Sequence, residues 1–185
     1  MPVKINDNET DFWTPGEAKD AQDALLSLIQ GATTELYTSD YAFCWVPLWE
    51  ALQVADKRGV KVHVLVDLSQ SARIWSQLQA FRASLTQGDV TVTTAGPTSP
   101  RPSQINHTKA MWTPEGVCWE GSVNFSMSGW EESNTCRLFT SVAWAQMATA
   151  LFISLREWAL THVKQLDTAG PTREELLALP PESEI

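Results

Sequence analysis

Hydrophobic and polar positions repeat along this chain with the periods of helices and strands. In residues 17–30 apolar side chains recur at helical spacing and Gly31 follows, which predicts an amphipathic helix. A second helix is predicted from Pro47 to about Arg58, because proline suits a first helical turn and Gly59 ends the pattern. Residues 72–85 predict a third helix by the same spacing.

The strand pattern is clearest in residues 60–66, VKVHVLV, where β-branched side chains form a nearly continuous apolar run. Such a run is typical of a strand that is covered on both faces. Shorter strands are predicted at residues 35–38, 90–93, 107–113, 117–120 and 136–142. Because strands and helices alternate as far as residue 93, the sequence predicts an α/β fold with β-α-β crossovers.

A long final helix is predicted around an apolar stripe, which we expect to be buried and which consists of Trp144, Met147, Leu151, Leu155 and Trp158. Residues 1–167 are expected to form a single domain. Residues 168–185 are acidic and are expected to be a mobile C-terminal tail.

Length and cysteine content limit the class of protein. A chain of 185 residues fits one domain and buries roughly 70% of its unfolded surface, so it needs no disulfide or metal for stability. Cys44, Cys118 and Cys136 form no C-x-x-C pair, and we expect each to be a small buried hydrophobe. The first residues lack the apolar run of a secretory signal, and no segment approaches the ~20 apolar residues of a membrane helix. We therefore expect a soluble, cytoplasmic protein.

The net charge of −9 is unevenly distributed. Residues 1–35 carry seven acids and two bases, whereas residues 71–140 carry five of each. A phosphate site in the neutral central region is therefore compatible with the acidic total, since the local distribution of charge decides binding. The sequence contains no broad basic track for long DNA.

Two short segments in this central region carry the candidate chemistry: His107-Thr108-Lys109 and Gly121-Ser122-Val123-Asn124-Phe125-Ser126. On a strand, the alternation of side chains places His107 and Lys109 on the same face. A neutral imidazole can attack phosphorus and an ammonium can offset the charge of the phosphate oxygens, while Ser122 and Asn124 can donate hydrogen bonds to them. No acidic cluster is present that would bind a metal, and no cofactor is expected.

The H-T-K segment and the G-S-V-N-F-S segment, with eleven residues between them, resemble the H-x-K and G-S-x-N-F/W-S/T pattern of the phospholipase D superfamily. The order of F-W-T-P, K-R-G-V and V-H-V-L-V-D upstream is similar to its small single-motif members, the bacterial Nuc-type endonucleases. The resemblance implies an α-β-α sandwich with a mixed, largely parallel sheet. It also implies a metal-independent phosphodiesterase, most often a nuclease, with His107, Lys109 and Asn124 catalytic and Ser122 binding phosphate.

A single-motif member is expected to form a homodimer through its active-site face, so that one His107 acts as the nucleophile and the other as the general acid. The chain departs from the family pattern in two places. Pro114 stands where the family has an aspartate, five positions after the lysine. The acid that orients the histidine in the family matches either Glu132 or Asn134 here, and the sequence does not choose between them.

Three functions stay open on the residues alone. A nuclease is favoured by the resemblance, a phospholipase D or phosphatidyltransferase would require an exposed apolar patch beside the site, and Pro114 leaves room for a catalytically impaired phosphate-binding module. Trp45 and Trp130 are candidate substrate contacts, because bases stack on aromatic rings. Most of the other tryptophans are expected to be core residues.

Overall fold

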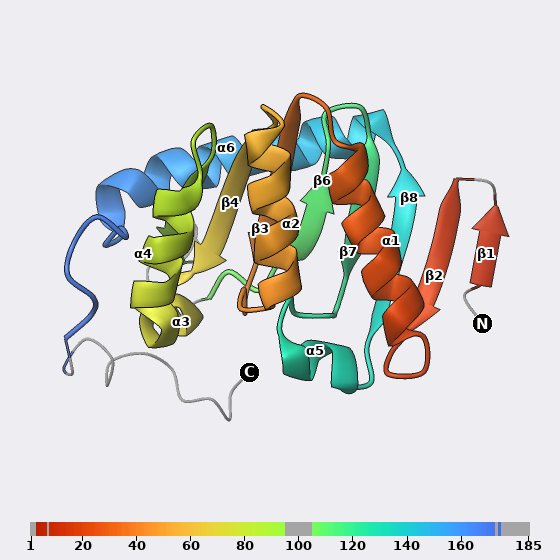
Figure 1. Ribbon diagram of the computed structural model, residues 1–185, viewed down its shortest axis with the longest axis horizontal. Helices are drawn as coiled ribbons and strands as arrows, with labels where there is room; N and C mark the ends of the chain where they lie inside the picture. Colours follow the sequence, from red (N-terminus) through yellow and green to blue (C-terminus); the bar gives the residue numbers. More distant parts are fainter. Residues whose placement is uncertain (1–2, 7, 95–104, 173, 175–185) are drawn as a thin grey trace.

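A single eight-stranded sheet runs through the molecule in the order β1-β2-β8-β7-β6-β3-β4-β5 (Figure 1). The structure is a computed structural model that describes residues 3–6, 8–94, 105–172 and 174. The strands in chain order are β1 (Val3–Asn6), β2 (Glu9–Trp13), β3 (Glu35–Asp40), β4 (Lys61–Asp67), β5 (Asp89–Thr93), β6 (Lys109–Trp112), β7 (Val117–Gly121) and β8 (Thr135–Thr140).

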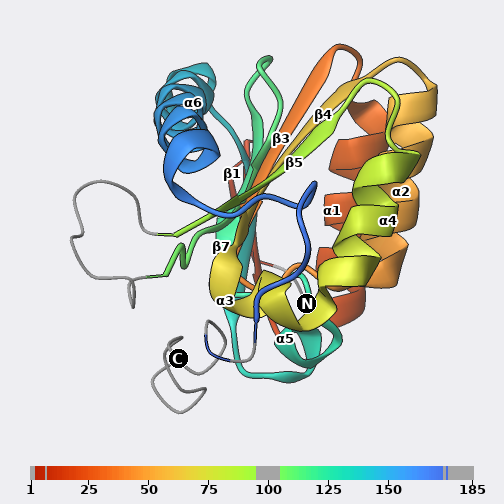
Figure 2. The same cartoon turned by 90° about the vertical axis from the view of Figure 1, so that its left-hand side faces the viewer.

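Helices cover both faces of the sheet, which confirms the predicted α-β-α sandwich (Figure 2). The helices are α1 (Ala18–Gly31), α2 (Val46–Lys57), α3 (Leu68–Ser71), the 3-10 turn η1 (Ala72–Ile74), α4 (Trp75–Ser84), α5 (Met127–Glu131) and α6 (Val142–His162). The main core lies between the sheet and α1, α2 and α4. A second, smaller core lies on the other face, under α6 alone.

The sheet is mixed, as predicted, but it is not largely parallel. Only β3–β4 and β4–β5 pair in parallel, and the other five neighbouring pairs are antiparallel. The parallel part corresponds to the predicted helical crossovers, whereas β6 and β7 are joined by a tight turn and must run in opposite directions. The β1–β2 hairpin was not predicted, and it adds two antiparallel strands beside β8.

The predicted stripe of α6 is wrong in part. The side chains that face the second core belong to a neighbouring stripe of Ala145, Phe152 and Ala159. Met147 and Leu151, both expected to be buried, are exposed. Small alanine side chains let the helix approach the sheet closely, and this rotation leaves the larger apolar side chains outside.

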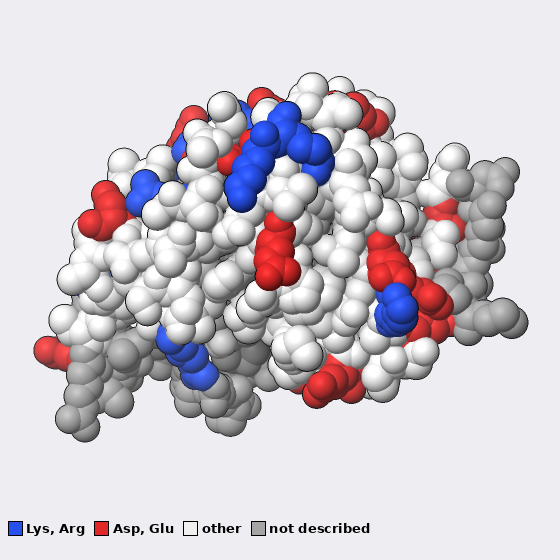
Figure 3. Space-filling model, viewed as in Figure 1, with Lys and Arg blue, Asp and Glu red and all other residues white. Residues whose placement is uncertain are grey.

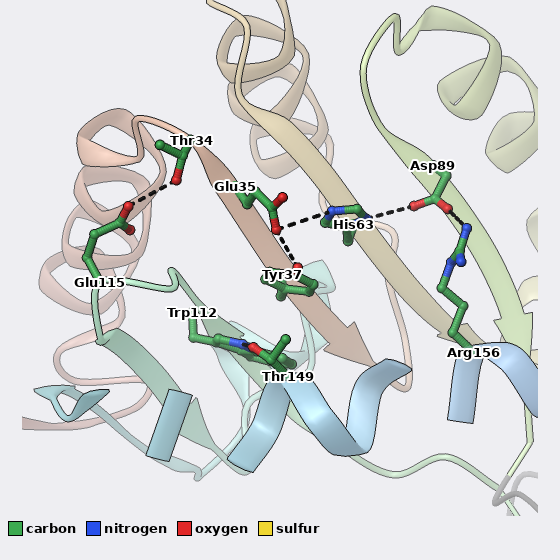
Figure 4. Close-up of polar contacts among 9 residues, drawn as sticks. All are labelled: Thr34, Glu35, Tyr37, His63, Asp89, Trp112, Glu115, Thr149 and Arg156. Atoms are coloured by element: carbon green, nitrogen blue, oxygen red, sulfur yellow. Dashed lines mark hydrogen bonds and ion pairs between the residues drawn. The ribbon is translucent and has the colours of Figure 1, made fainter. Parts of the chain in front are cut away.

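Polar contacts fasten the far end of α6 to the sheet (Figure 4). Arg156 of α6 forms an ion pair with Asp89 of β5. A second oxygen of Asp89, Oδ1, lies 3.2 Å from His63 Nδ1 of β4, within hydrogen-bond distance. The His63 ring stacks on Tyr37 with centroids 4.6 Å apart. These contacts fix the position of α6 over β3, β4 and β5, while the rest of the helix leans over the antiparallel half of the sheet. 

Cys118 and Cys136 are buried as predicted, but Cys44 is exposed because it lies in the loop after β3. Beyond α6 the chain returns along α4, where Trp75 Nε1 donates to the carbonyl oxygen of Thr168 at 3.2 Å. Within the described residues, no helix combines the length and the apolar character needed to cross a membrane.

Candidate active site

The carboxyl ends of β3 and β4 meet the start of β6 at one end of the sheet (Figure 1). β6 begins at Lys109 rather than at the predicted His107, because β3 ends opposite Lys109 and offers the preceding residues no neighbouring strand. Side chains hold that segment instead. The backbone N–H of Asn106 donates to Asp67 Oδ2 at 2.6 Å, and Asn106 Nδ2 donates to Ser39 Oγ at 3.0 Å.

His107 and Lys109 line the same pocket and share Tyr41 as a neighbour. The rings of Tyr41 and His107 meet edge to face with centroids 5.1 Å apart, and Lys109 Nζ lies 5.2 Å from the centre of the Tyr41 ring. Lys109 Nζ also donates to the carbonyl oxygen of His107 at 2.9 Å. Tyr41 is 2% exposed and its hydroxyl accepts from Gln70 Nε2 at 2.6 Å, so the ring is a fixed support for both residues.

Two buried aspartates lie behind the site, and sequence reasoning missed both. Asp40, at the end of β3, pairs in register with Lys109 and is 0% exposed. Asp67, at the end of β4, accepts from Ser69 N at 2.8 Å and from Asn106 N at 2.6 Å. The available signal was an aspartate at the end of each parallel strand, because the carboxyl ends of such strands are where ligands bind in α/β sheets.

Burial controls the protonation of the site. Desolvation raises the pKa of Asp40, against the opposing effects of the Lys109 ammonium and of backbone N–H groups. Burial lowers the pKa of Lys109, although Asp40 and Asp67 favour its ammonium form. Partial desolvation of the imidazole and the nearby Lys109 lower the pKa of His107 below 6.5. At neutral pH His107 is therefore an uncharged imidazole, which is the nucleophilic form.

The segment from Gly121 to Ser126 leaves β7 beside Lys109, and two glycines allow its path. A Cβ atom at Gly121 would lie 2.4 Å from the carbonyl oxygen of Thr135, and one at Gly129 would lie 2.3 Å from that of Asn124. Asn124 is half-buried, and its Oδ1 is buried without a hydrogen-bond partner among the described residues. This oxygen can therefore accept a hydrogen bond that the described residues do not supply.

The Ser122 hydroxyl is already used within the fold. Ser122 Oγ accepts from Thr135 N at 3.0 Å and donates to Asn134 Oδ1 at 2.9 Å. These contacts tie the segment to the start of β8. The Ser122 side chain, which was expected to bind phosphate, thus has a structural role in the fold. Its contact with phosphate stays a prediction.

Neither candidate for the orienting group reaches His107. The Asn134 carboxamide is held by Ser122 and by the carbonyl oxygen of Gly129, to which Asn134 Nδ2 donates at 3.0 Å. Glu132 is exposed and does not line the pocket that contains His107. Among the described residues no side chain makes a hydrogen bond to the His107 imidazole, so the Tyr41 ring is its closest described support.

The two tryptophans expected to touch substrate are core residues instead. Trp45 and Trp130 are buried and pack on each other with ring centroids 5.1 Å apart. They are buried because Trp45 is the N-cap residue of α2, where its backbone N–H donates to Phe125 O at 2.8 Å, and Trp130 lies on the inner side of α5. Trp13, which was not singled out from the sequence, is 60% exposed and lines the pocket.

The pocket has a volume of about 820 Å³ and extends from His107 along the side of α6 that carries Trp144, Leu151 and Leu155. Register places Asp11, Arg137, Glu120 and Ala110 next to one another across its floor. Arg137 pairs with Glu120 and, at 2.7 Å, with Glu9, so this one cation offsets only part of the acidic charge of the floor. The wall that α6 provides is apolar and consists of Trp144, Met147, Leu151 and Leu155 among others.

Charge on the helical face of α1, α2 and α4 is scattered (Figure 3). Lys and Arg side chains gather near the top of that face, where the last turn of α2 lies. Arg58, the residue after α2, donates from Nη2 to the carbonyl oxygens of Ile29 and Gln30 at 3.0 and 3.2 Å, so it caps the end of α1. Within the described part of the chain, no group of three or more His, Cys, Asp and Glu side chains is placed to hold a metal ion.

The fold and the site define a phospholipase D-like protein. Residues 25–155 match the family model of the cardiolipin synthase, phospholipase D-like domain, and the chain belongs to this family. No curated protein sequence matches the chain.

The family match confirms the resemblance predicted from the two segments, and solved structures with the same fold include two Nuc proteins. NucT from Helicobacter pylori superposes with a TM-score of 0.73 at 18% identity, over 81% of this chain and 96% of that one. Nuc from Salmonella typhimurium, a phospholipase D family member, superposes with a TM-score of 0.65 at 20% identity, over 85% and 96%. Phosphatidylserine synthase from Haemophilus influenzae gives a TM-score of 0.63 at 13% identity, over 83% and 40%.

Proposed function

We propose that the chain is a metal-independent phosphodiesterase that hydrolyses nucleic acid, with His107 as its nucleophile. The observation that carries the proposal is the presence of a neutral imidazole, His107, and a buried ammonium, Lys109, in one pocket, next to the end of β7 from which the Asn124 segment departs. The similarity in fold to NucT and Nuc along nearly their whole length supports the choice of substrate. A single catalytic domain of residues 1–167 and a cytoplasmic location remain predictions.

The proposed reaction has two displacements at phosphorus. In the first, an imidazole nitrogen of His107 forms a bond to phosphorus while the bond to the leaving oxygen breaks, and a general acid protonates that oxygen. In the second, water that has lost a proton to the same group attacks phosphorus and breaks the P–N bond. Lys109 and Asn124 stabilise the charge on the phosphate oxygens in both steps.

The general acid is proposed to be the His107 of a second copy of the chain. Neither of the two other described histidines lies in the pocket, because His63 is under α6 and His162 lies at the end of that helix. The exposed apolar side chains on the pocket side of α6, Met147 and Leu151, are a surface that a homodimer would cover.

The same apolar wall favours a second candidate, hydrolysis or transfer of a phospholipid. Acyl chains would lie along α6 while the phosphate sits at His107. The two candidates differ in the use of Met147 and Leu151, which a dimer would bury and a lipid-binding monomer would leave accessible. A catalytically impaired phosphate-binding module is the third candidate, since no described acid orients His107.

Hydrolysis of single-stranded DNA, duplex DNA, RNA and phosphatidylcholine, each in the presence of EDTA, tests the proposal. We expect nucleic acid to be cleaved in the chelator, and His107→Ala to abolish turnover without loss of the fold, because the imidazole is exposed and outside any strand. His162→Ala is the matched control and should keep full activity.

Each contrary result points elsewhere. Cleavage of the lipid alone would favour the second candidate. Phosphate binding without turnover of any substrate would favour the third. Loss of all cleavage in EDTA, with recovery on added metal, would rule out the metal-independent mechanism.

A further inference from the structure

We propose that Asp40, which belongs to neither motif segment, is a positioning residue that holds Lys109 of the first segment and Asn124 of the second in one arrangement. The inference rests on the proposed function, because it assigns a part in the same site. Asp40 is the last residue of β3, and its side chain is completely buried between the two segments.

Contact with the second segment is direct. The backbone N–H of Phe125 donates to both carboxylate oxygens of Asp40, at 3.3 and 3.4 Å. The carbonyl oxygen of Phe125 accepts from the N–H groups of Cys44 and Trp45, at 2.9 and 2.8 Å. Phe125 is therefore held by the last residue of β3 at its N–H and by the following loop at its carbonyl oxygen, and Asn124, the preceding residue, can point its carboxamide in few directions.

Coupling to the first segment is electrostatic. Asp40 and Lys109 are register partners across β3 and β6, and both are buried. The groups that face the Lys109 ammonium are Asp40 from β3, Asp67 from β4, the Tyr41 ring, and His107 just before β6. The two carboxyl groups favour the ammonium form that a phosphate requires, while burial opposes it.

Asp67 does not duplicate this role. Its carboxylate oxygens accept from the N–H and hydroxyl of Ser69 and from the N–H of Asn106, so it anchors the chain just before His107. Asp40 alone among the described acids contacts the second segment and favours the Lys109 ammonium. The two aspartates thus have different roles: Asp67 holds the chain before His107, and Asp40 holds the second segment at Phe125.

Replacement of Asp40 by asparagine keeps the size of the side chain and removes its charge. The Lys109 ammonium then loses one of its two favourable carboxyl neighbours, and we expect its pKa to fall. The basic limb of the pH profile of kcat/KM should move to lower pH by the same amount. A drop in kcat of at least about tenfold should accompany this shift, because Asn124 and Lys109 act on the reacting phosphate.

Two measurements test the role separately. Steady-state kinetics on the nucleic acid that the wild-type protein cleaves give the pH profile, and NMR of protein labelled with ¹³C at the lysine Cε gives the pKa of Lys109 directly. Asp56→Asn is the matched control. Asp56 is also a buried aspartate that accepts backbone N–H groups, from Thr86, Gln87 and Gly88, but it lies outside the pocket.

The expected outcome is a shifted pH profile and a lowered pKa of Lys109 in Asp40→Asn, with both unchanged in Asp56→Asn. An unchanged pKa of Lys109 in a folded Asp40→Asn protein would overturn the proposal. If that variant does not fold, the wild-type protein decides: the Lys109 Cε resonance should show a titration step at the midpoint that the Phe125 amide reports for Asp40, and a Lys109 resonance that does not respond at that pH would overturn the proposal. A wild-type protein that cleaves nothing would refute the proposed function and leave the NMR result on Asp40 standing.

Discussion

The exposed side of α6 gives the sharpest test of the shared active site. Leu151 is 65% exposed and Met147 is 53% exposed, and both side chains form part of the apolar wall of the pocket. Replacement of Leu151 by serine removes apolar surface from this wall without a change in the buried stripe of the helix, which contains Phe152 and not Leu151. The variant should therefore fold normally and dimerise weakly.

The size of the effect follows from the exposed fraction. Full burial of a leucine side chain contributes about 1.5–3 kcal/mol, so covering the exposed two thirds of Leu151 contributes about 1–2 kcal/mol. A two-fold interface contains the residue twice, which brings the loss to about 2–4 kcal/mol. Dimerisation should therefore weaken about 30- to 1000-fold.

Sedimentation equilibrium over a series of protein concentrations measures this change. Val54→Ser is the control, because Val54 is 53% exposed on α2, on the opposite face of the sheet. Specific activity of the Leu151→Ser protein should recover at high concentration, since the site is proposed to need two copies. Equal dissociation constants for the two variants, or a wild-type protein that is active as a monomer, would refute the reasoning.

Three further predictions concern the site and the core. The lowered pKa of His107 keeps the imidazole neutral under mildly acidic conditions, so the acid limb of kcat/KM should lie below pH 6.5; a midpoint at or above that value would contradict the assignment. Trp13→Ala should weaken binding of single-stranded nucleic acid about 5- to 150-fold, as measured by fluorescence anisotropy, because one stacked base contributes about 1–3 kcal/mol. Asp56→Ala should lower the free energy of unfolding in urea by about 3 kcal/mol at pH 7. Although burial opposes it, hydrogen bonding from Thr86, Gln87 and Gly88 lowers the pKa of Asp56, so this loss should shrink as the pH falls through that pKa, and a constant difference would argue against it.

The sequence predicted elements well where one face of a regular pattern is buried. The helix at residues 17–30 and the strand at residues 60–66 agree with α1 and β4 to within two residues at each end. The prediction failed where two patterns overlap. α6 carries apolar residues on neighbouring stripes, and only contact with the sheet decides that Phe152 is buried and Leu151 is exposed. The sheet order also depends on long-range pairing, which a local period cannot contain.

The same limit applies to the site. The two motif segments predicted His107, Lys109 and Asn124 as site residues, because a sequence motif contains residues that lie close together along the chain. It could not identify Tyr41, Asp40 and Asp67, which approach Lys109 only through the pairing of β3 with β6 and β4. Trp45 and Trp130 were misread for the related reason that a tryptophan near a motif has no sequence signal for burial.

The departure at Pro114 has a physical explanation in the geometry of β6. Residue 114 lies five positions beyond Lys109, and at ~3.3 Å per residue it is about 16 Å away along the strand, at the opposite end from the phosphate site. The turn there is closed by Thr113 N to Val117 O at 3.0 Å and by Gly116 N to Thr113 O at 3.0 Å, and Glu115 accepts from Thr34 Oγ1 at 3.0 Å (Figure 4). An acid at position 114 is thus not needed to close the turn and is too far from Lys109 to act on its ammonium. The carboxyl groups that favour the Lys109 ammonium lie instead at the ends of β3 and β4, so this interaction does not depend on an acid at position 114.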